Sequence, residues 1–449
     1  MVLKLPTYKA AFGSFVISFI LSILIWKQPI LSSSTAALEG LIMALWPIIL
    51  VIIAAVFTYN LSCETKGIDI IKQMIASVSS DKRILVLLIA WCFGGFMEGM
   101  AGFGTAIAIP AGMLTSLGFN PLFSVLVCLI ANGCPTPFGS IGIPTVTLAN
   151  LVGLENAPLA FMTSLQLAPF MLMCPFLIVM VTGGGRKALK GVSLLTLLSG
   201  LSFVLPQLVV SYFIGAELAV VVGSVCSLLC TILLSMKRSV PDQYKVNIET
   251  KESVSLETAI KAWYPFILIF VFLLFTSKLV APINTSLAQY ASQFVIYTGK
   301  NPNTLSLSWI NTPGVWIFLS AFIGGLIQRA SVKTMLTVLK NTIIQMKETM
   351  ATMICVLACA KIMSYSGMIS TISTFAISTT GSFYPIFAPW IGALGTFVTS
   401  SGTNSGVLFG AVQIDAAQQL HTNPYWTVAL NSLGVAAGKM LSPQCLAIG

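Results

Sequence analysis

Residues Gly94 to Pro144 read GGFMEGMAGFGTAIAIPAGMLTSLGFNPLFSVLVCLIANGCPTPFGSIGIP. This stretch is apolar enough for a lipid bilayer, yet Gly, Pro and Asn interrupt it, and it carries one carboxylate, Glu98. A charge in the hydrocarbon core costs about 2.5–3.5 kcal/mol on insertion scales. Non-helical backbone is tolerated at that depth only where protein buries it or where it lines a wet cavity. We therefore predict that this stretch forms a functional site and that the rest of the chain holds it in place.

A second stretch, residues Gly392 to Pro443, repeats this layout. Each stretch holds a Gly-Thr pair and, further along, an Asn, a Gly and a Pro at matching spacing. The matched residues are Gly104-Thr105 with Gly402-Thr403, Asn132 with Asn431, Gly139 with Gly438, and Pro144 with Pro443. Paired, Gly/Pro-interrupted segments in two halves of a chain are typical of the binding site of a secondary transporter. Because Gly is frequent in membrane helices in general, chance similarity is the competing explanation.

The composition indicates a membrane protein. Of the 449 residues, 56% are hydrophobic and 8% are charged, against about 25% charged residues in a typical soluble domain. The net charge of +10 comes from Lys and Arg that lie mostly in loops, which membrane topology explains without a nucleic-acid partner. The ten cysteines show no metal-ligand spacing, so we expect no metal and no cofactor. Motifs for ATP binding, zinc hydrolysis or a nucleophile elbow are missing from the sequence, which favours a transporter over an enzyme.

We predict an all-α polytopic membrane protein with about 12 membrane segments in two inverted-topology repeats, whose broken or re-entrant helices meet at the midplane. Residues 1–236 form the N-terminal repeat with the first broken motif (94–144), and residues 263–449 form the C-terminal repeat with the second (392–443). Residues 237–262 are a polar cytoplasmic linker between them.

Outside the two motifs, eight apolar segments are predicted to span the membrane. They are residues 10–26, 37–61 with a kink at Trp46-Pro47, 158–181, 191–208, 218–236, 263–279, 309–327, and 342–380 with an interruption at Tyr365-Ser366-Gly367. Apolar residues at helical spacing predict an amphipathic helix within residues 64–83 that lies in the membrane interface. Residues 281–308 are polar and rich in Asn, and we expect an external loop there.

The distribution of Lys and Arg predicts the orientation. These residues concentrate in segments 62–83, 183–190, 237–261 and 328–347, whereas loops 118–120, 207–216, 381–384 and 415–423 carry none. Since cytoplasmic loops are rich in Lys and Arg, we place the basic segments and the N-terminus in the cytoplasm and the protein in the plasma (inner) membrane. The first broken stretch then enters the bilayer from the cytoplasm and the second from outside, as an inverted repeat requires.

Two charged residues in apolar runs are candidates for transport chemistry. Glu98 is a carboxylate in low-dielectric surroundings, where the protonated form is favoured, so it can carry a proton near neutral pH. A structural ion pair with a lysine is the alternative. Lys439 lies inside the second motif and can neutralise an anionic substrate or pair with Glu98; the alternative is a lysine that extends to the lipid headgroups. Lys361 also lies in an apolar run, and function and structure are equally favoured there.

The Gly-Thr breaks add neutral groups to this candidate site. A helix that restarts after Gly104 or Gly402 presents unpaired N–H groups and the positive end of its dipole, which together attract anions. Hydroxyl and amide groups near these helix ends suit an anion that carries its own hydroxyl, although they would cap the helices in either case. The predicted substrate-binding residues are Gly104, Thr105, Asn132, Ser401, Thr403, Asn404, Asn431 and Lys439, with Glu98 for proton coupling.

Five runs of the sequence together resemble the lactate permease family of bacteria: FMEGMAGFGTAIAIP, LIANGCPTPFGSIGIP, YSGM, PWIGALGTFVT and AAGKMLSPQ. The resemblance covers both broken stretches and much of the chain between them, and Glu98, Asn132 and Lys439 fall on matching positions. It implies a symporter of protons with lactate, or with related 2-hydroxy-monocarboxylates such as glycolate, that works by alternating access. An uncoupled uniporter or an anion channel is the alternative function, and a homo-oligomer is left open.

The chain departs from this family pattern in two places. Where the family usually reads GSDTNSN, residues 400–406 read SSGTNSG, so Gly402 replaces an acid. Family members also generally continue beyond the residue that matches Gly449. The first departure bears directly on proton coupling or substrate choice, because it removes a carboxylate from a predicted break.

Overall fold

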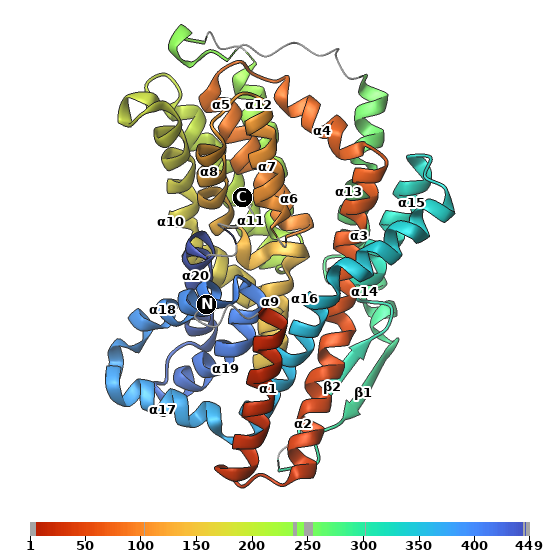
Figure 1. Ribbon diagram of the computed structural model, residues 1–449, viewed down its shortest axis with the longest axis vertical. Coiled ribbons are helices and arrows are strands. Elements are labelled where there is room, and N and C mark those ends of the chain that lie inside the picture. The colour runs from red at the N-terminus through yellow and green to blue at the C-terminus, as the bar shows by residue number, and fades with distance from the viewer. Residues whose placement is uncertain are drawn as a thin grey trace.

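The computed structural model is described here for residues 6–102, 104–236, 240–246, 255–300, 302–442 and 445, with the backbone alone for Thr105 and Leu256. This part of the chain is almost entirely helical, as predicted (Figure 1). Up to residue 236 the helices are α1 (Thr7–Leu24), α2 (Ile30–Met43), α3 (Leu50–Glu64), α4 (Gly67–Ala76), α5 (Lys82–Val86), α6 (Gly94–Met100), α7 (Thr105–Ser116), α8 (Pro121–Gly133), α9 (Gly139–Val152), α10 (Asn156–Gly183), α11 (Ser193–Phe213) and α12 (Ala219–Ser235). The π-helical turns Ala44–Ile49 and Leu87–Phe93 join α2 to α3 and α5 to α6.

The rest of the described chain adds a second set of helices and a β-hairpin. They are α13 (Leu256–Thr276), α14 (Ala281–Ala288), β1 (Ala291–Val295), β2 (Thr304–Ser308), α15 (Pro313–Ile327), α16 (Val332–Ser366), α17 (Met368–Thr380), α18 (Tyr384–Thr399), α19 (Gly402–Gln419) and α20 (Pro424–Leu441). In Figure 1, α10, α11 and α12 stand in the upper half of the view, whereas α17, α18 and α19 lie at the lower left and the hairpin at the lower right.

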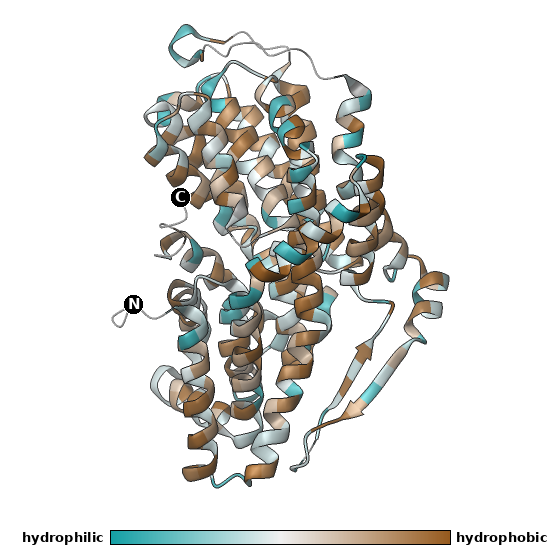
Figure 2. Cartoon of the chain, turned by 45° about the vertical axis from the view of Figure 1, so that its right-hand side comes forward, coloured by the Kyte–Doolittle hydropathy of each residue, from teal (hydrophilic) through white to brown (hydrophobic). Residues whose placement is uncertain are grey.

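The helices are long and apolar enough for a multi-pass membrane protein. In the described chain seven helices are long and apolar enough to cross a membrane, and α8 with α9, bent by 64°, makes an eighth if the pair counts as one span. Shorter apolar helices at residues 106–116, 219–235 and 313–327 account for further segments that the sequence predicted. Hydrophobic residues cover much of the length of the helices, and hydrophilic ones occur both in the end loops and at mid-height (Figure 2).

The span Lys82–Met100 lies at the centre of the molecule. The surrounding protein buries the apolar part of this span completely. Asp81 begins the span by accepting a hydrogen bond from the Arg83 backbone N–H. Two glycines on the span let neighbouring helices approach closely: Gly95 faces the Phe203 ring of α11, and Gly99 faces Val220 and Val221 of α12. A helix wrapped on all sides can carry polar groups that lipid would exclude.

The four basic segments gather at one end of the molecule. Gln328 accepts a hydrogen bond from Thr65 and donates to the Lys261 carbonyl. Arg83 donates to the carbonyls of Ala188 and Lys190, and Lys245 forms a β-bridge with Asp81. These contacts place the basic loops on a common side, which is the arrangement that the orientation argument needs. Of the predicted linker 237–262, residues 237–239 and 247–254 lie outside the described residues.

Local predictions in the first half and in α16 are confirmed. The chain is non-helical at Trp46 (φ −135°, ψ 120°), where the Trp46-Pro47 kink was expected. The long segment after Thr342 breaks at Gly367, which has φ +87°. Residues 67–76 form the amphipathic helix, with Ile68, Ile71 and Ile75 buried against the protein.

Two predictions are corrected. Residues 281–308 are not a plain loop, because they form α14 and an antiparallel hairpin in which Ala291 pairs with Ser308; strand β2 alternates as TLSLS, which is a strand pattern. The second motif also lacks the break expected after Asn431, since α20 continues to Leu441. The first motif breaks there because Pro135 and Pro137 follow Asn132, whereas α20 meets no proline after Pro424 until Pro443. The inverted repeat therefore stays a prediction.

Gly434 of α20 tests the closest helix contact of the second motif. A Cβ at Gly434 would collide with the Pro389 carbonyl of α18, so we expect Gly434→Ala to destabilise the protein by about 1–3 kcal/mol through overpacking. Thermal unfolding in detergent measures this effect. Gly112→Ala on α7 is the matched control, because no atom lies within 4 Å of a Cβ there. Equal melting temperatures for the two variants would contradict the packing of α18 on α20.

Candidate functional site

Three breaks in helical backbone meet inside the molecule. They lie between α6 and α7 (residues 101–104), between α8 and the regular part of α9 (134–142), and between α18 and α19 (400–401). The Ser140 hydroxyl donates a hydrogen bond of 2.8 Å to the Ala101 carbonyl, which joins the first two breaks. Gly402 packs against Thr136, where an added Cβ would lie 3.2 Å from the threonine methyl, which joins the second and third. The structure therefore brings the two sequence motifs together.

Glu98 lies where the first two breaks meet. It is 3% exposed and lies so close to Gly139 that a Cβ there would be 2.5 Å from Glu98 Oε1. The Asn132 amide from α8 approaches the carboxylate, and the Lys439 charge acts on it from α20. Among the described residues, no ion pair joins Glu98 to Lys439, and Glu98 Oε2 has no hydrogen-bond partner. The Glu98 carboxylate is thus buried and under the influence of the Lys439 charge, but it forms no direct ion pair with that lysine.

Lys439 connects α20 to the third break. Its side chain is 6% exposed, and Nζ donates a 3.1 Å hydrogen bond to the Ser400 carbonyl. Ser400 has a left-handed backbone (φ +58°) at the end of α18, and its hydroxyl bonds that of Ser442. The ammonium therefore turns inward to the Ser400 carbonyl at the break rather than outward to the membrane surface. An ammonium has three donors, so this contact leaves capacity for a ligand.

The two Gly-Thr helix starts differ in detail. Gly104 precedes α7 with φ +88°, while the side chain of Thr105 lies outside the described residues. Helix α19 begins at Gly402 and is capped by the Ser401 hydroxyl, which accepts from the Asn404 N–H at 3.2 Å. Thr403, in the first turn of α19, is buried. Ser401 thus performs the capping role that was the competing explanation for it, and Thr403 and Asn404 remain available at a helix N-terminus.

Three buried amides in and around the two motifs lack hydrogen-bond partners within the described chain. Asn132 is 2% exposed and Asn431 fully buried, and in the described chain these are the two residues whose side-chain oxygen and nitrogen both lack hydrogen bonds. The side-chain oxygen of Asn404, which is 4% exposed, is also unpaired. Unpaired buried amides are rare in proteins because each costs about 1–3 kcal/mol. Such groups are expected where a ligand or water completes the hydrogen bonds.

Not every predicted residue joins Glu98 and Lys439. Asn431 lies two turns before Lys439 on α20, about 12 Å along the axis, and its backbone packs against Gly392 of α18. Asn431, the residue that matches Asn132 in the second motif, therefore lies beside α18 rather than beside Glu98. This separation follows from the uninterrupted course of α20.

Three residues that shape the site were not among the predicted substrate-binding residues: Thr136, Gly139 and Ser140. They lie in or just before the run GSIGIP, in which Ser140, Ile141 and Gly142 all have positive φ (47°, 58° and 75°). Ile141 is β-branched, and this conformation costs such a residue about 1–3 kcal/mol; strained backbone of this kind clusters at functional sites. The two prolines ahead of it predict a break, but they do not predict its contact with Ala101.

Comparison with known proteins gives consistent matches over the whole chain. A family model described as L-lactate permease matches residues 1–449. The L-lactate permease of Streptococcus iniae is 45% identical over 94% of this chain and 88% of that protein. For Escherichia coli K12, the L-lactate permease is 32% identical over 99% of this chain, and glycolate permease GlcA is 32% identical over 100%, each over 86% of the relative.

Two solved transporters share the fold. The YdaH transporter of Alcanivorax borkumensis aligns with a TM-score of 0.52 at 14% identity, over 98% of this chain and 90% of that one. MtrF of Neisseria gonorrhoeae aligns with a TM-score of 0.52 at 12% identity, over 99% and 88%. At these identities the likeness concerns the fold alone, and it agrees with the polytopic helical architecture described above.

Asn431 allows the unpaired amides to be tested through stability. We expect Asn431→Leu to raise the melting temperature in detergent, because it removes two unpaired polar atoms at similar volume, a gain of about 1–3 kcal/mol. Asn60→Leu is the matched control. It should lower the melting temperature, since the Asn60 amide donates to Thr342 and Gln345 at 2.9 Å each. A destabilised Asn431→Leu would mean that the Asn431 amide is satisfied in the folded protein.

Proposed function

Because this chain belongs to the L-lactate permease family, we propose that it transports lactate, and related 2-hydroxy-monocarboxylates such as glycolate, by symport with protons across the plasma membrane. The relatives named L-lactate permease and glycolate permease support the substrate class. The basic end of the molecule faces the cytoplasm in this proposal, and residues 1–236 and 263–449 act as the two repeats.

The arrangement of Glu98 and Lys439 is the observation that carries the proposal. The two charges come from different motifs, are both buried, and lie at the junction of three backbone breaks. A carboxylate substrate needs a cation, and the Lys439 ammonium has donors to spare beyond its bond to Ser400. The N-terminus of α19 adds backbone N–H groups and a favourable dipole for the same anion.

The unpaired amide of Asn132 suits the other end of the substrate. A 2-hydroxy acid carries a hydroxyl that both donates and accepts, and Asn132 presents an amide that does the same beside Glu98. A site built to bond a hydroxyl discriminates strongly against an analogue that lacks it, because its buried polar groups then stay unpaired. This feature favours lactate and glycolate over propionate and acetate.

Charge balance links the anion to the proton. In the empty site an ionised Glu98 offsets Lys439, whereas in the loaded site a substrate carboxylate takes that place. A second negative charge in a low-dielectric site is unfavourable, so Glu98 is neutralised by a proton when the anion binds. Empty and loaded sites then carry the same net charge, which supports one proton for each anion.

Glu98 is tested by separating exchange from accumulation. We expect Glu98→Gln in proteoliposomes to retain lactate exchange but to lose lactate accumulation driven by a pH gradient, because the amide imitates the protonated carboxylate and cannot release a proton. The unmodified protein should accumulate lactate until a protonophore is added. Undiminished accumulation by Glu98→Gln would exclude this residue as the proton carrier. Equilibration without accumulation in the unmodified protein would favour the uniporter or channel.

Lys439 is tested through affinity. We expect Lys439→Met to weaken lactate binding by roughly 10- to 150-fold, the equivalent of about 1.5–3 kcal/mol for a lost charge-assisted contact. Lys340→Met is the matched control, since Lys340 is an exposed lysine of α16 and its loss should leave binding unchanged. Half-saturation of lactate exchange provides the measurement, with thermal stability as the folding check. A folded Lys439→Met with unchanged half-saturation would show that this lysine does not contact the substrate.

A further inference from the structure

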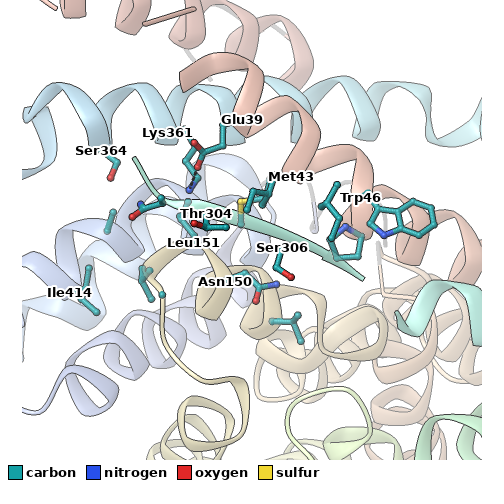
Figure 3. A pocket seen from close by; sticks show the side chains of 18 of the residues that line it. Glu39, Met43, Trp46, Asn150, Leu151, Thr304, Ser306, Lys361, Ser364 and Ile414 are labelled. Carbon is teal, nitrogen blue, oxygen red and sulfur yellow. Dashed lines mark ion pairs between the residues drawn. The ribbon is translucent and has the colours of Figure 1, made fainter. Parts of the chain in front are cut away.

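A second polar site lies away from Glu98, in a cavity of about 820 Å³ beside the hairpin. Helices α2, α9, α16, α17 and α19 and strand β2 form its walls, and the side chains of Glu39 and Lys361 converge within it (Figure 3). Its lining includes Glu39, Trp46, Asn150, Ser306, Lys361 and Asp415. Lys361 is the lysine whose role the sequence left open.

The cavity lies at the end of two helices that begin at the central site. Helix α9 runs from Gly139, beside Glu98, to Asn150 at the cavity, and α19 runs from Gly402, beside Thr136, to Asp415. At 1.5 Å per residue the regular part of α9, from Ile143 to Asn150, is roughly 11 Å long, and the path along α19 is roughly 20 Å long. The hydrocarbon core is about 30 Å thick, so half its thickness is about 15 Å. With the central site at the midplane, as the predicted transporter architecture has it, the cavity lies toward the membrane face opposite the basic loops.

The ion pair in this cavity holds a lysine with unused donors. Lys361 Nζ lies 2.8 Å from Glu39 Oε1, and the two side chains are 9% and 1% exposed. Tyr365 donates to both Glu39 oxygens at 3.0 Å, and its ring stacks on Tyr297 at 3.7 Å. Glu39 is thus fully engaged, whereas the contact with Glu39 uses one of three ammonium donors.

Stability alone is a poor explanation for this pair. The desolvation of two charges commonly exceeds their attraction, so apolar residues of similar size would hold α2 and α16 together at least as well. A buried ionisable pair inside a membrane protein is more typical of a pathway for ions or substrates. Its position in a cavity toward one membrane face agrees with that role.

We propose that Glu39 and Lys361 form a loading site that takes up a small monocarboxylate together with a proton, before the anion reaches Lys439; this inference rests on the proposed function. The proton neutralises Glu39, which releases Lys361, and the substrate carboxylate then becomes the partner of the ammonium. Tyr365 continues to donate to the neutral carboxyl group. The one covalent change is the O–H bond formed on Glu39 by a proton from the solution on that side, which also supplies the anion. That bond breaks again when the anion leaves for Lys439 and the Glu39–Lys361 pair re-forms, so that the proton leaves with the anion.

The charges around the cavity explain why the two must load together. Glu39, Lys361 and Asp415 are the charged groups among its described lining residues and sum to −1; Asp415 accepts hydrogen bonds from Ser373 and Gln419. An anion alone would raise the total to −2, whereas an anion with a proton keeps it at −1. Since the loading site needs the proton, the apparent KM for lactate should rise as the pH on that side rises.

Three variants in proteoliposomes test the loading site by the KM of lactate exchange at pH 6 and pH 8. We expect Lys361→Met to raise KM about 10-fold or more, through loss of the cation. Glu39→Gln should reduce the rise in KM between pH 6 and pH 8 to the part that Glu98 causes, with its pH 8 value falling toward the pH 6 value, while accumulation driven by a pH gradient persists through Glu98. The double variant Glu39→Gln/Lys361→Met leaves no unpaired buried charge and should show the same raised KM if Lys361→Met alone does not fold.

The outcomes separate the two proposals. If the unmodified protein does not exchange lactate, the proposed function fails. If it does, but Glu39→Gln keeps the unmodified pH profile and the Lys361 variants keep the unmodified KM, then the pair is structural and the loading site is overturned. Lys340→Met on the same helix controls for the loss of positive charge in general and should leave KM unchanged at both pH values.

Discussion

Every polar group of a backbone that stops being helical inside a bilayer must find a partner within the protein, and the rest of this structure depends on that constraint. Three breaks meet near the centre, and side chains of the motifs satisfy them. Ser140 donates to the Ala101 carbonyl, and Lys439 donates to the Ser400 carbonyl. The span Lys82–Met100 can lead into these breaks because other helices bury it completely. The outer helices thus replace lipid by protein around a site that lipid would not tolerate.

The same constraint distinguishes the buried carboxylates from one another. In the described chain three carboxylates are almost completely buried: Glu39, Asp81 and Glu98. Asp81 pairs with Arg83 at 2.7 Å and Glu39 with Lys361 at 2.8 Å. Glu98 faces a lysine without such a contact and keeps one oxygen unpaired. Of the three, Glu98 is the one that a proton can complete without first breaking an ion pair, whereas protonation of Glu39 in the proposed loading site has to release Lys361. This difference supports the proposed coupling role of Glu98.

Sequence patterns predicted where helices stop better than they predicted where the chain goes next. The breaks at Gly104 and Gly367 and the kink at Trp46 follow from Gly and Pro, whose backbone preferences are local. The burial of Glu98 and Lys439 followed from charges in apolar runs. The contacts of Gly402 with Thr136 and of Ser140 with Ala101 depend on how distant segments pack, which no local pattern specifies. The β-hairpin was missed because its strands are short and mostly exposed, with Leu307 as their buried residue, so that the segment resembles a polar loop in composition.

Gly402 shows how one departure from the family pattern is accommodated by packing. The resemblance leads one to expect an acid at this position, but a Cβ there would lie 2.8 Å from Val435 Cγ1 and 3.2 Å from Thr136 Cγ2. Val435 thus occupies space that a longer side chain at residue 402 would need, so the glycine and the valine fit one another across α19 and α20. The absence of a carboxylate at residue 402 leaves Glu98 without a like charge from that position, which would otherwise favour its protonated form. Under the proposed function, Lys439, the buried surroundings and the arriving anion would then be the groups that act on Glu98, and binding of the substrate itself would be the main cause of proton uptake.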